Sequence, residues 1–226
     1  MKKLWFVLKG GITMLNLLYK EFRLCAHPTL YVFMLMGCLI IIPSYPYGVV
    51  FLFSCLAPFI TFYNARENHD AFYTALLPVR KSDIVKSKCL LVVIAELGLI
   101  IISLPFAYLR TIIVPEGNPV GIEANFAYYG FGLVLFSVFN LIFFTEFYKT
   151  AYKIGRAFIL AMIPAMIIMI GMETLPHIPA TKWVDSMAPD MLLKQLPILG
   201  VGVILYMAFT YAACRIASTR FKRADL

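Results

Sequence analysis

The side chains that could carry chemistry are few and widely spaced. The chain has three histidines, and none belongs to an H-E-x-x-H pattern that would hold zinc. The five cysteines form no C-x-x-C pair, so we expect small buried apolar side chains rather than metal ligands. Neither a G-x-x-x-x-G-K-[ST] loop for nucleotide phosphates nor a G-x-S-x-G nucleophile turn occurs. These patterns predict no enzyme, no metal and no cofactor in this chain.

One acidic residue stands inside a long apolar segment. Glu96 follows Lys88 by eight residues, which is about 12 Å along a helix axis. An ionised carboxylate is costly at that depth in a membrane, so Glu96 should face protein or water. It either lines a cavity or pairs with a cation, or it bonds to a neighbouring helix, for instance through a tyrosine hydroxyl. Asn140 is a second polar candidate for the cavity or for such a contact.

The composition decides what surrounds these residues. Of 226 residues, 62% are hydrophobic and only 14% are charged. Soluble domains are usually about 45–50% apolar and about 25% charged. A water-soluble fold of this length could not bury the excess, and the same figures exclude a disordered chain, a collagen and a disulfide scaffold. The composition therefore predicts an integral membrane protein.

Six apolar runs divide the chain, and a helical crossing needs about 20 such residues. We predict one all-α transmembrane domain over residues 1–226, with spans at about 29–43, 47–64, 83–109, 125–147, 157–172 and 195–214. The first two are short, and Pro43 and Pro46 predict a tight reversal between them. Between the last two spans, short helices resting on the membrane are expected, one of them at 187–193. Residues 1–13 begin like a signal peptide, but Lys9 interrupts the apolar run, so no signal is expected.

The formal charge of +8 is unevenly distributed. Basic residues gather before the first span, between spans two and three, between spans four and five, and after span six. The opposite connections contain only Arg110, Lys182 and Lys194. Positive charge marks the cytoplasmic side, so both termini are predicted to be cytoplasmic. The charge therefore indicates topology, and no nucleic-acid partner is expected.

Two segments outside the spans have helical patterns. Residues 15–25 place their apolar side chains on one arc, which predicts a basic amphipathic helix in the membrane interface. Residues 65–82 form the longest inner connection, and within it Asp70–Leu77 predicts a short helix capped by Asp70 and ended by Pro78. The aromatic and leucine side chains of this helix fit either the inner leaflet or a groove on a soluble protein.

The same connection resembles the first inner loop of type-two ABC exporter permeases. In that family an acidic residue precedes a short coupling helix, and a Leu-Pro-x-x-Arg-type turn leads into the third span. Here residues 67–88 read E-N-H-D-A-F-Y-T-A-L-L-P-V-R-K-S-D-I-V-K-S-K. The segment before the first span is similar to the amphipathic helix of the family. The resemblance implies that eight residues couple the chain to an ATPase: Glu67, Asp70, Phe72, Tyr73, Leu76, Leu77, Pro78 and Arg80.

The resemblance also implies partners and a function. A P-loop ATPase subunit, holding ATP and magnesium, would dock on the coupling helix, and a second copy or a sister permease would complete the pathway. Closure of the ATPases would switch the spans between inward and outward states. The cargo would be an amphipathic peptide, antibiotic or lipid, exported across a bacterial plasma membrane, with Glu96 and Asn140 in the translocation cavity. The alternative is the substrate-binding membrane component of an importer, which would lack the docking helix.

Overall fold

The computed structural model describes residues 14–113, 117–150 and 152–223, and this part of the chain contains helices and no strands. The opening residues 1–13 lie outside it. The elements in order are α2 (Met14–Lys20), the π-helical turn η1 (Glu21–Cys25), α3 (Pro28–Leu35), η2 (Met36–Ile41), α4 (Gly48–Glu67), α5 (Asp70–Ala75), α6 (Lys81–Ile113), α7 (Phe126–Phe147), α8 (Ile154–Thr174), η3 (Leu175–His177), η4 (Pro179–Val184) and α9 (Pro189–Arg223). The predicted all-α class is confirmed.

Five single helices are long and apolar enough to cross a membrane: α4, α6, α7, α8 and α9. A sixth crossing is obtained when α2–η1 and α3–η2 are taken together as one broken span, bent by 93°. The bend falls at Pro28, which has no backbone N–H and begins α3 behind a His27 cap. The predicted six spans match the upper count, and the chain is a multi-pass membrane protein.

α7 is the central helix of the bundle. In its most apolar window 67% of the residues are buried, against 22% in α8 and 22% in α9. Phenylalanine rings of α4 and α7 fill the interior; Phe51 meets Phe136 edge to face at 5.4 Å, and Phe62 meets Phe143 in the same way. α9 approaches α7 closely where Gly202 lies against Gly130, because a Cβ at Gly202 would overlap the Gly130 carbonyl.

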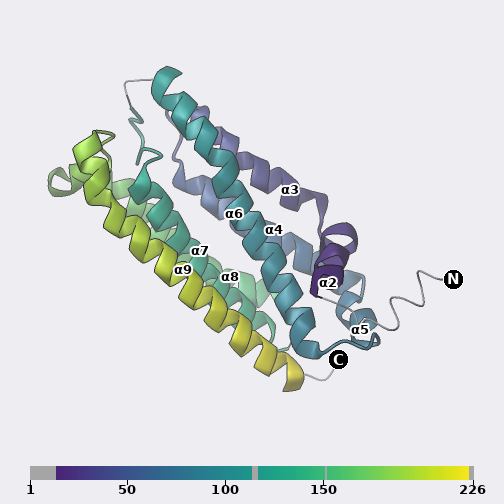
Figure 1. Cartoon of the computed structure of the whole chain (residues 1–226). Coiled ribbons are helices and arrows are strands. Elements are labelled where there is room, and N and C mark those ends of the chain that lie inside the picture. The colour runs from purple at the N-terminus through teal and green to yellow at the C-terminus, as the bar shows by residue number, and fades with distance from the viewer. Residues whose placement is uncertain (1–13, 114–116, 151, 224–226) are drawn as a thin grey trace.

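The two ends of the bundle differ (Figure 1). α2, α5 and the last turns of α9 lie together at one end, which we call the α5 end. At the opposite end Glu173 accepts hydrogen bonds from the backbone N–H groups of Gly48 and Ile122, and Gln195 donates to the Trp183 carbonyl at 3.0 Å. The separate helix predicted for 187–193 is wrong, because the last span begins at Pro189 and runs through that segment without a break.

Candidate functional site

The candidate site is α5 and the side chains that hold it. His69 reverses the chain after α4 with a left-handed backbone (φ 51°), and α5 follows at once. α5 ends at Ala75, two residues before the predicted Leu77, and Leu76 and Leu77 form the turn toward Pro78. The prediction that Asp70 caps this helix is wrong. The N-cap is His69, no side chain caps the helix, and the Asp70 carboxylate is engaged elsewhere.

Asp70 belongs to a lysine–carboxylate cluster formed by Lys20, Glu21, Asp70 and Lys88. The Lys88 ammonium lies 2.7 Å from an Asp70 oxygen and 2.9 Å from a Glu21 oxygen. The Lys20 ammonium lies 2.7 Å from Asp70 and 3.0 Å from Glu21, so each lysine contacts both carboxylates. Lys20 also donates to the Thr74 hydroxyl at 2.9 Å. The cluster therefore ties α5 to α2–η1 and to the first turns of α6.

The charges in this cluster stabilise one another. Burial by itself would raise the pKa of the Asp70 carboxyl, but Lys88 and Lys20 outweigh it and hold that pKa well below the ordinary value. Burial would likewise lower the pKa of the Lys20 ammonium, but Glu21 and Asp70 raise it above the ordinary value. Asp70 and Lys20 are therefore charged near neutral pH, and the cluster pairs two lysine side chains with two carboxyl groups.

α5 is attached by polar groups and leaves its apolar side chains uncovered. Thr74, which receives the Lys20 hydrogen bond, is only 3% exposed. Phe72 is 50% exposed, Tyr73 63% and Leu76 69%. Exposed aromatic and leucine side chains of this kind, gathered on one short helix, are typical anchors for a partner protein. The structure thus separates an attachment side of α5 from a free apolar side.

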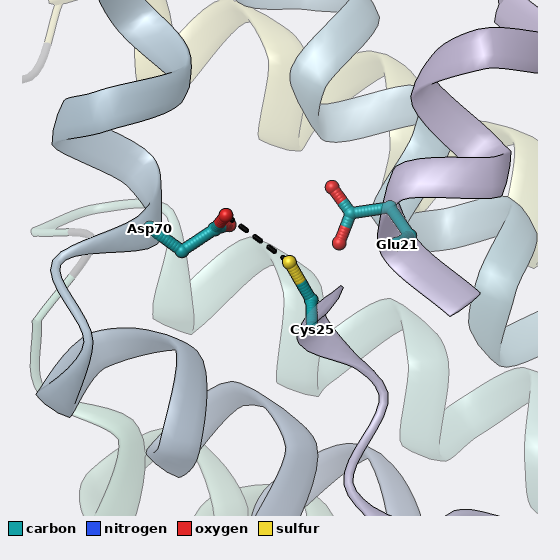
Figure 2. A group of neighbouring side chains, drawn as sticks. All are labelled: Glu21, Cys25 and Asp70. Carbon is teal, nitrogen blue, oxygen red and sulfur yellow. Dashed lines mark hydrogen bonds between the residues drawn. The ribbon is translucent and has the colours of Figure 1, made fainter. Parts of the chain in front are cut away.

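Cys25 lies against the same carboxylates. Its thiol donates to Asp70 at 3.1 Å, and Figure 2 shows Glu21 pointing into the same space from the other side. Oxygen and sulfur atoms of these three residues lie within 4.8 Å of one another, a spacing that a metal ion could use. Burial raises the pKa of the Cys25 thiol to about 12, and both carboxylates already bind Lys88. A metal would have to displace that ammonium, so the residues fit an ion-pair cluster better than a metal site.

The other predicted coupling residues surround α5 without joining the cluster. Glu67 ends α4 and pairs with Arg66 at 2.5 Å on the surface. Pro78 and Arg80 are exposed in the turn before α6, where the Arg80 carbonyl accepts the Asp83 N–H at 2.8 Å. Beside α5 lies a pocket of about 230 Å³, whose aromatic wall includes Phe62, Phe72, Tyr148 and Phe221.

Glu96 and Asn140 lie away from α5, in the interior of the bundle. The Asn140 side-chain amide donates to Glu96 at 2.9 Å, and the Tyr206 hydroxyl donates to the same carboxylate at 2.7 Å. Both Glu96 and Asn140 are buried. Of the two interpretations of Glu96 given by the sequence, these contacts match the second, a bond to neighbouring helices that includes a tyrosine hydroxyl. A role in a translocation cavity stays a prediction.

Sequence reasoning missed four members of the site: Lys20, Glu21, Thr74 and Lys88. Glu21 and Lys88 are 67 positions apart, so no local spacing pairs them. One signal was available. An acidic residue in a basic interfacial helix and a lysine at the start of an apolar span both need a partner once they are buried.

The comparisons with known proteins agree with this geometry. The family model described as ABC-2 family transporter protein matches residues 16–218, which include α5 and most of every candidate span. Neither a curated protein nor a solved structure matches the chain.

Proposed function

Because the chain belongs to the ABC-2 family of transporter proteins, it is the membrane component of an ABC transporter, and we propose that it works as the permease subunit of an ATP-driven exporter. A separate P-loop ATPase binds ATP and magnesium and docks on α5. A second copy or a sister permease completes the pathway. The cargo is an amphipathic peptide, antibiotic or lipid-like molecule, carried across a bacterial plasma membrane.

The observation that carries this proposal is the uncovered apolar side of α5. Phe72 and Tyr73 are exposed on this helix of only six residues, and Leu76 and Leu77 are exposed in the turn that follows it. Such a helix is too short to be stable alone in water, so its shape depends on what it contacts. Its own subunit holds the polar side, and the apolar side is left for a partner with a hydrophobic groove.

The distribution of charge also supports docking of a cytoplasmic partner at the α5 end of the bundle. Arg80, Lys81 and Lys86 lie just after α5, and Arg220 and Lys222 lie at the end of α9 on the same end of the bundle. A basic surface of this kind favours the cytoplasmic side of a membrane, and it supports our proposal that both termini are cytoplasmic. It also favours a partner whose groove has an acidic rim.

The lysine–carboxylate cluster supports a route for the ATPase movement. A displacement of α5 acts on Asp70, and Asp70 binds Lys88 in the first turns of α6 and Lys20 in α2. α6 then continues as one helix to Ile113, across the whole bundle. In this proposal Glu67, Pro78 and Arg80 set the two turns that flank α5, and Glu96 and Asn140 respond to the resulting movement of α6.

Co-purification of the tagged full-length permease with its ATPase tests the proposal. Leu76→Asp places a carboxylate on the free side of α5, where it disturbs no buried contact, so the permease should stay folded and lose the ATPase. Thr219→Asp is the matched control, because Thr219 is exposed at the same end of the bundle but lies on α9. Equal retention of the ATPase by Leu76→Asp, Thr219→Asp and the unchanged chain would overturn docking on α5.

A further inference from the structure

The buried carboxyl group of Glu96 joins three helices. Glu96 lies in the middle of α6 and is 1% exposed. Its Oε2 atom accepts both hydrogen bonds described above, one from Asn140 on α7 and one from Tyr206 on α9. All of the donated hydrogen bonds therefore fall on one oxygen of the carboxyl group.

Within the described part of the chain, no ion pair balances the charge that this group would carry when ionised. None of the lysine, arginine and histidine side chains in the described residues forms an ion pair with Glu96. The titratable groups that face it are Cys55 on α4, Cys89 on α6 itself and Tyr206 on α9, and α7 presents the amide of Asn140. All of these are neutral. An isolated carboxylate in an apolar interior costs far more free energy than a carboxylic acid, because the charge loses its hydration.

Two buried atoms at this place have no hydrogen-bond partner: Glu96 Oε1 and Asn140 Oδ1. They belong to the same two side chains that are already joined by the Asn140 Nδ2–H to Glu96 Oε2 hydrogen bond. Both atoms are acceptors if Glu96 is ionised, so neither can satisfy the other, and each buried acceptor without a donor costs about 1–3 kcal/mol. A single proton on Oε1 would turn that atom into a donor, and a hydrogen bond from it to Asn140 Oδ1 would remove both deficits together.

We propose that Glu96 is a proton-binding site inside the membrane, where Oε1 carries a proton and donates it to Asn140 Oδ1. The carboxylic acid and the amide then form a cyclic pair with two parallel hydrogen bonds between α6 and α7. Tyr206 adds the third helix through Oε2. The bound proton is the ligand of this site, and it holds the middle of α6 to its neighbours. This inference is independent of the export function, since it requires neither an ATPase nor a cargo.

Infrared spectroscopy of the full-length permease in lipid nanodiscs tests it directly. At neutral pH the protein should show the carbonyl stretch of a protonated carboxyl group, and Glu96→Gln should abolish that band. Glu146→Gln is the control, because Glu146 lies at the end of α7 paired with Lys149, so its replacement should leave the band in place. A spectrum without a Glu96-dependent carboxylic-acid band at neutral pH would overturn the proposal.

Two variants test the cyclic pair itself. Glutamine at position 96 reproduces the protonated acid, since its NH₂ group donates where Oε1–H does and its oxygen accepts as Oε2 does. Glu96→Gln should therefore keep the melting temperature, whereas Glu96→Ala should lower it. Asn140→Leu keeps the acid but removes the ring partner, so the carbonyl band should remain and move to higher frequency. A melting temperature that falls as far in Glu96→Gln as in Glu96→Ala, or a band unmoved by Asn140→Leu, would contradict the pair.

Discussion

Replacement of Lys88 should release α5 from the rest of the subunit. The Lys88 side chain is 7% exposed, and its ammonium contacts Glu21 and Asp70, which are 0% and 14% exposed. In Lys88→Met the length of the side chain is kept, and two carboxylates are left with Lys20 alone. Removal of one partner from a buried ion pair costs about 3–5 kcal/mol. Because Lys20 still neutralises one carboxylate and Asp70 is partly exposed, we expect the lower limit, about 3 kcal/mol.

Hydrogen exchange of the α5 backbone amides in the full-length permease measures this cost. If the free energy that holds α5 in place falls by about 3 kcal/mol, the population in which α5 is detached rises by roughly two powers of ten, and exchange should accelerate by that factor. Lys86→Met is the matched control, because Lys86 lies on the same helix but makes an exposed pair with Asp83 at 3.2 Å. Exposed pairs contribute about 0–1 kcal/mol, so this variant should exchange almost as the unchanged chain does.

A double mutant gives the sharper result. Asp70→Asn together with Lys88→Met removes one charge of each sign and leaves the Lys20–Glu21 pair, 3.0 Å apart, intact. The double variant should therefore hold α5 better than Lys88→Met alone, since no carboxylate remains without a cation. If the two single effects simply add, or if Lys88→Met behaves like Lys86→Met, the cluster does not hold α5 in the way inferred.

Three further predictions concern pH, the thiol and the helix crossing. The pKa of Asp70 is lowered in the folded chain, so its contribution to the stability of α5 is complete above the ordinary value of 3.8 and is lost only as the pH falls through the lowered value. Hydrogen exchange of α5, corrected for intrinsic rates, should therefore not vary between about pH 5 and about pH 8. With a pKa of about 12, Cys25 stays protonated at pH 8, so mass spectrometry should find it alkylated by a maleimide only after unfolding. Gly202→Ala should lower the free energy of unfolding by about 1–3 kcal/mol, because the new Cβ meets the Gly130 backbone. Gly200→Ala, with nothing within 4 Å of its Cβ, should be neutral or slightly stabilising.

The sequence predicted the elements better than their contacts, and the reason is physical. Apolar periodicity is a property of neighbouring residues, so the spans and the short helix after Asp70 could be found from local patterns. The last span was predicted from position 195 because the charged Lys194 precedes the apolar run. The structure continues the helix back to Pro189, since Gln195 is buried by hydrogen bonds from its side chain to Trp183 and Ser186. Those partners lie on η4 and in the connection after it, and no local pattern reveals them.

Asp70 illustrates the same limit at the candidate site. Its type and position, just before a short apolar run, favour an N-cap, and that local preference is worth about 1 kcal/mol. The partly buried Lys20 and the buried Lys88 offer the same carboxylate considerably more, and they lie 50 and 18 positions away along the chain. The stronger long-range contact therefore decides where the carboxylate points. A sequence pattern can identify a residue that needs a partner, but tertiary packing determines which partner it finds.

Ion pairs are suited to holding α5 because this helix leaves its apolar side chains exposed. A six-residue helix has few side chains, and those that we propose to bind an ATPase by apolar contact cannot also be buried in their own subunit. The attachment must then use the remaining polar positions, which are Asp70 and Thr74. Apolar packing has no preferred direction and allows sliding, whereas two lysines that each bridge both carboxylates fix α5 against displacement along several directions. Under the proposed function, such an attachment would transmit a pull as well as a push from the partner to α6, and a coupling element that returns the permease to its starting state requires both.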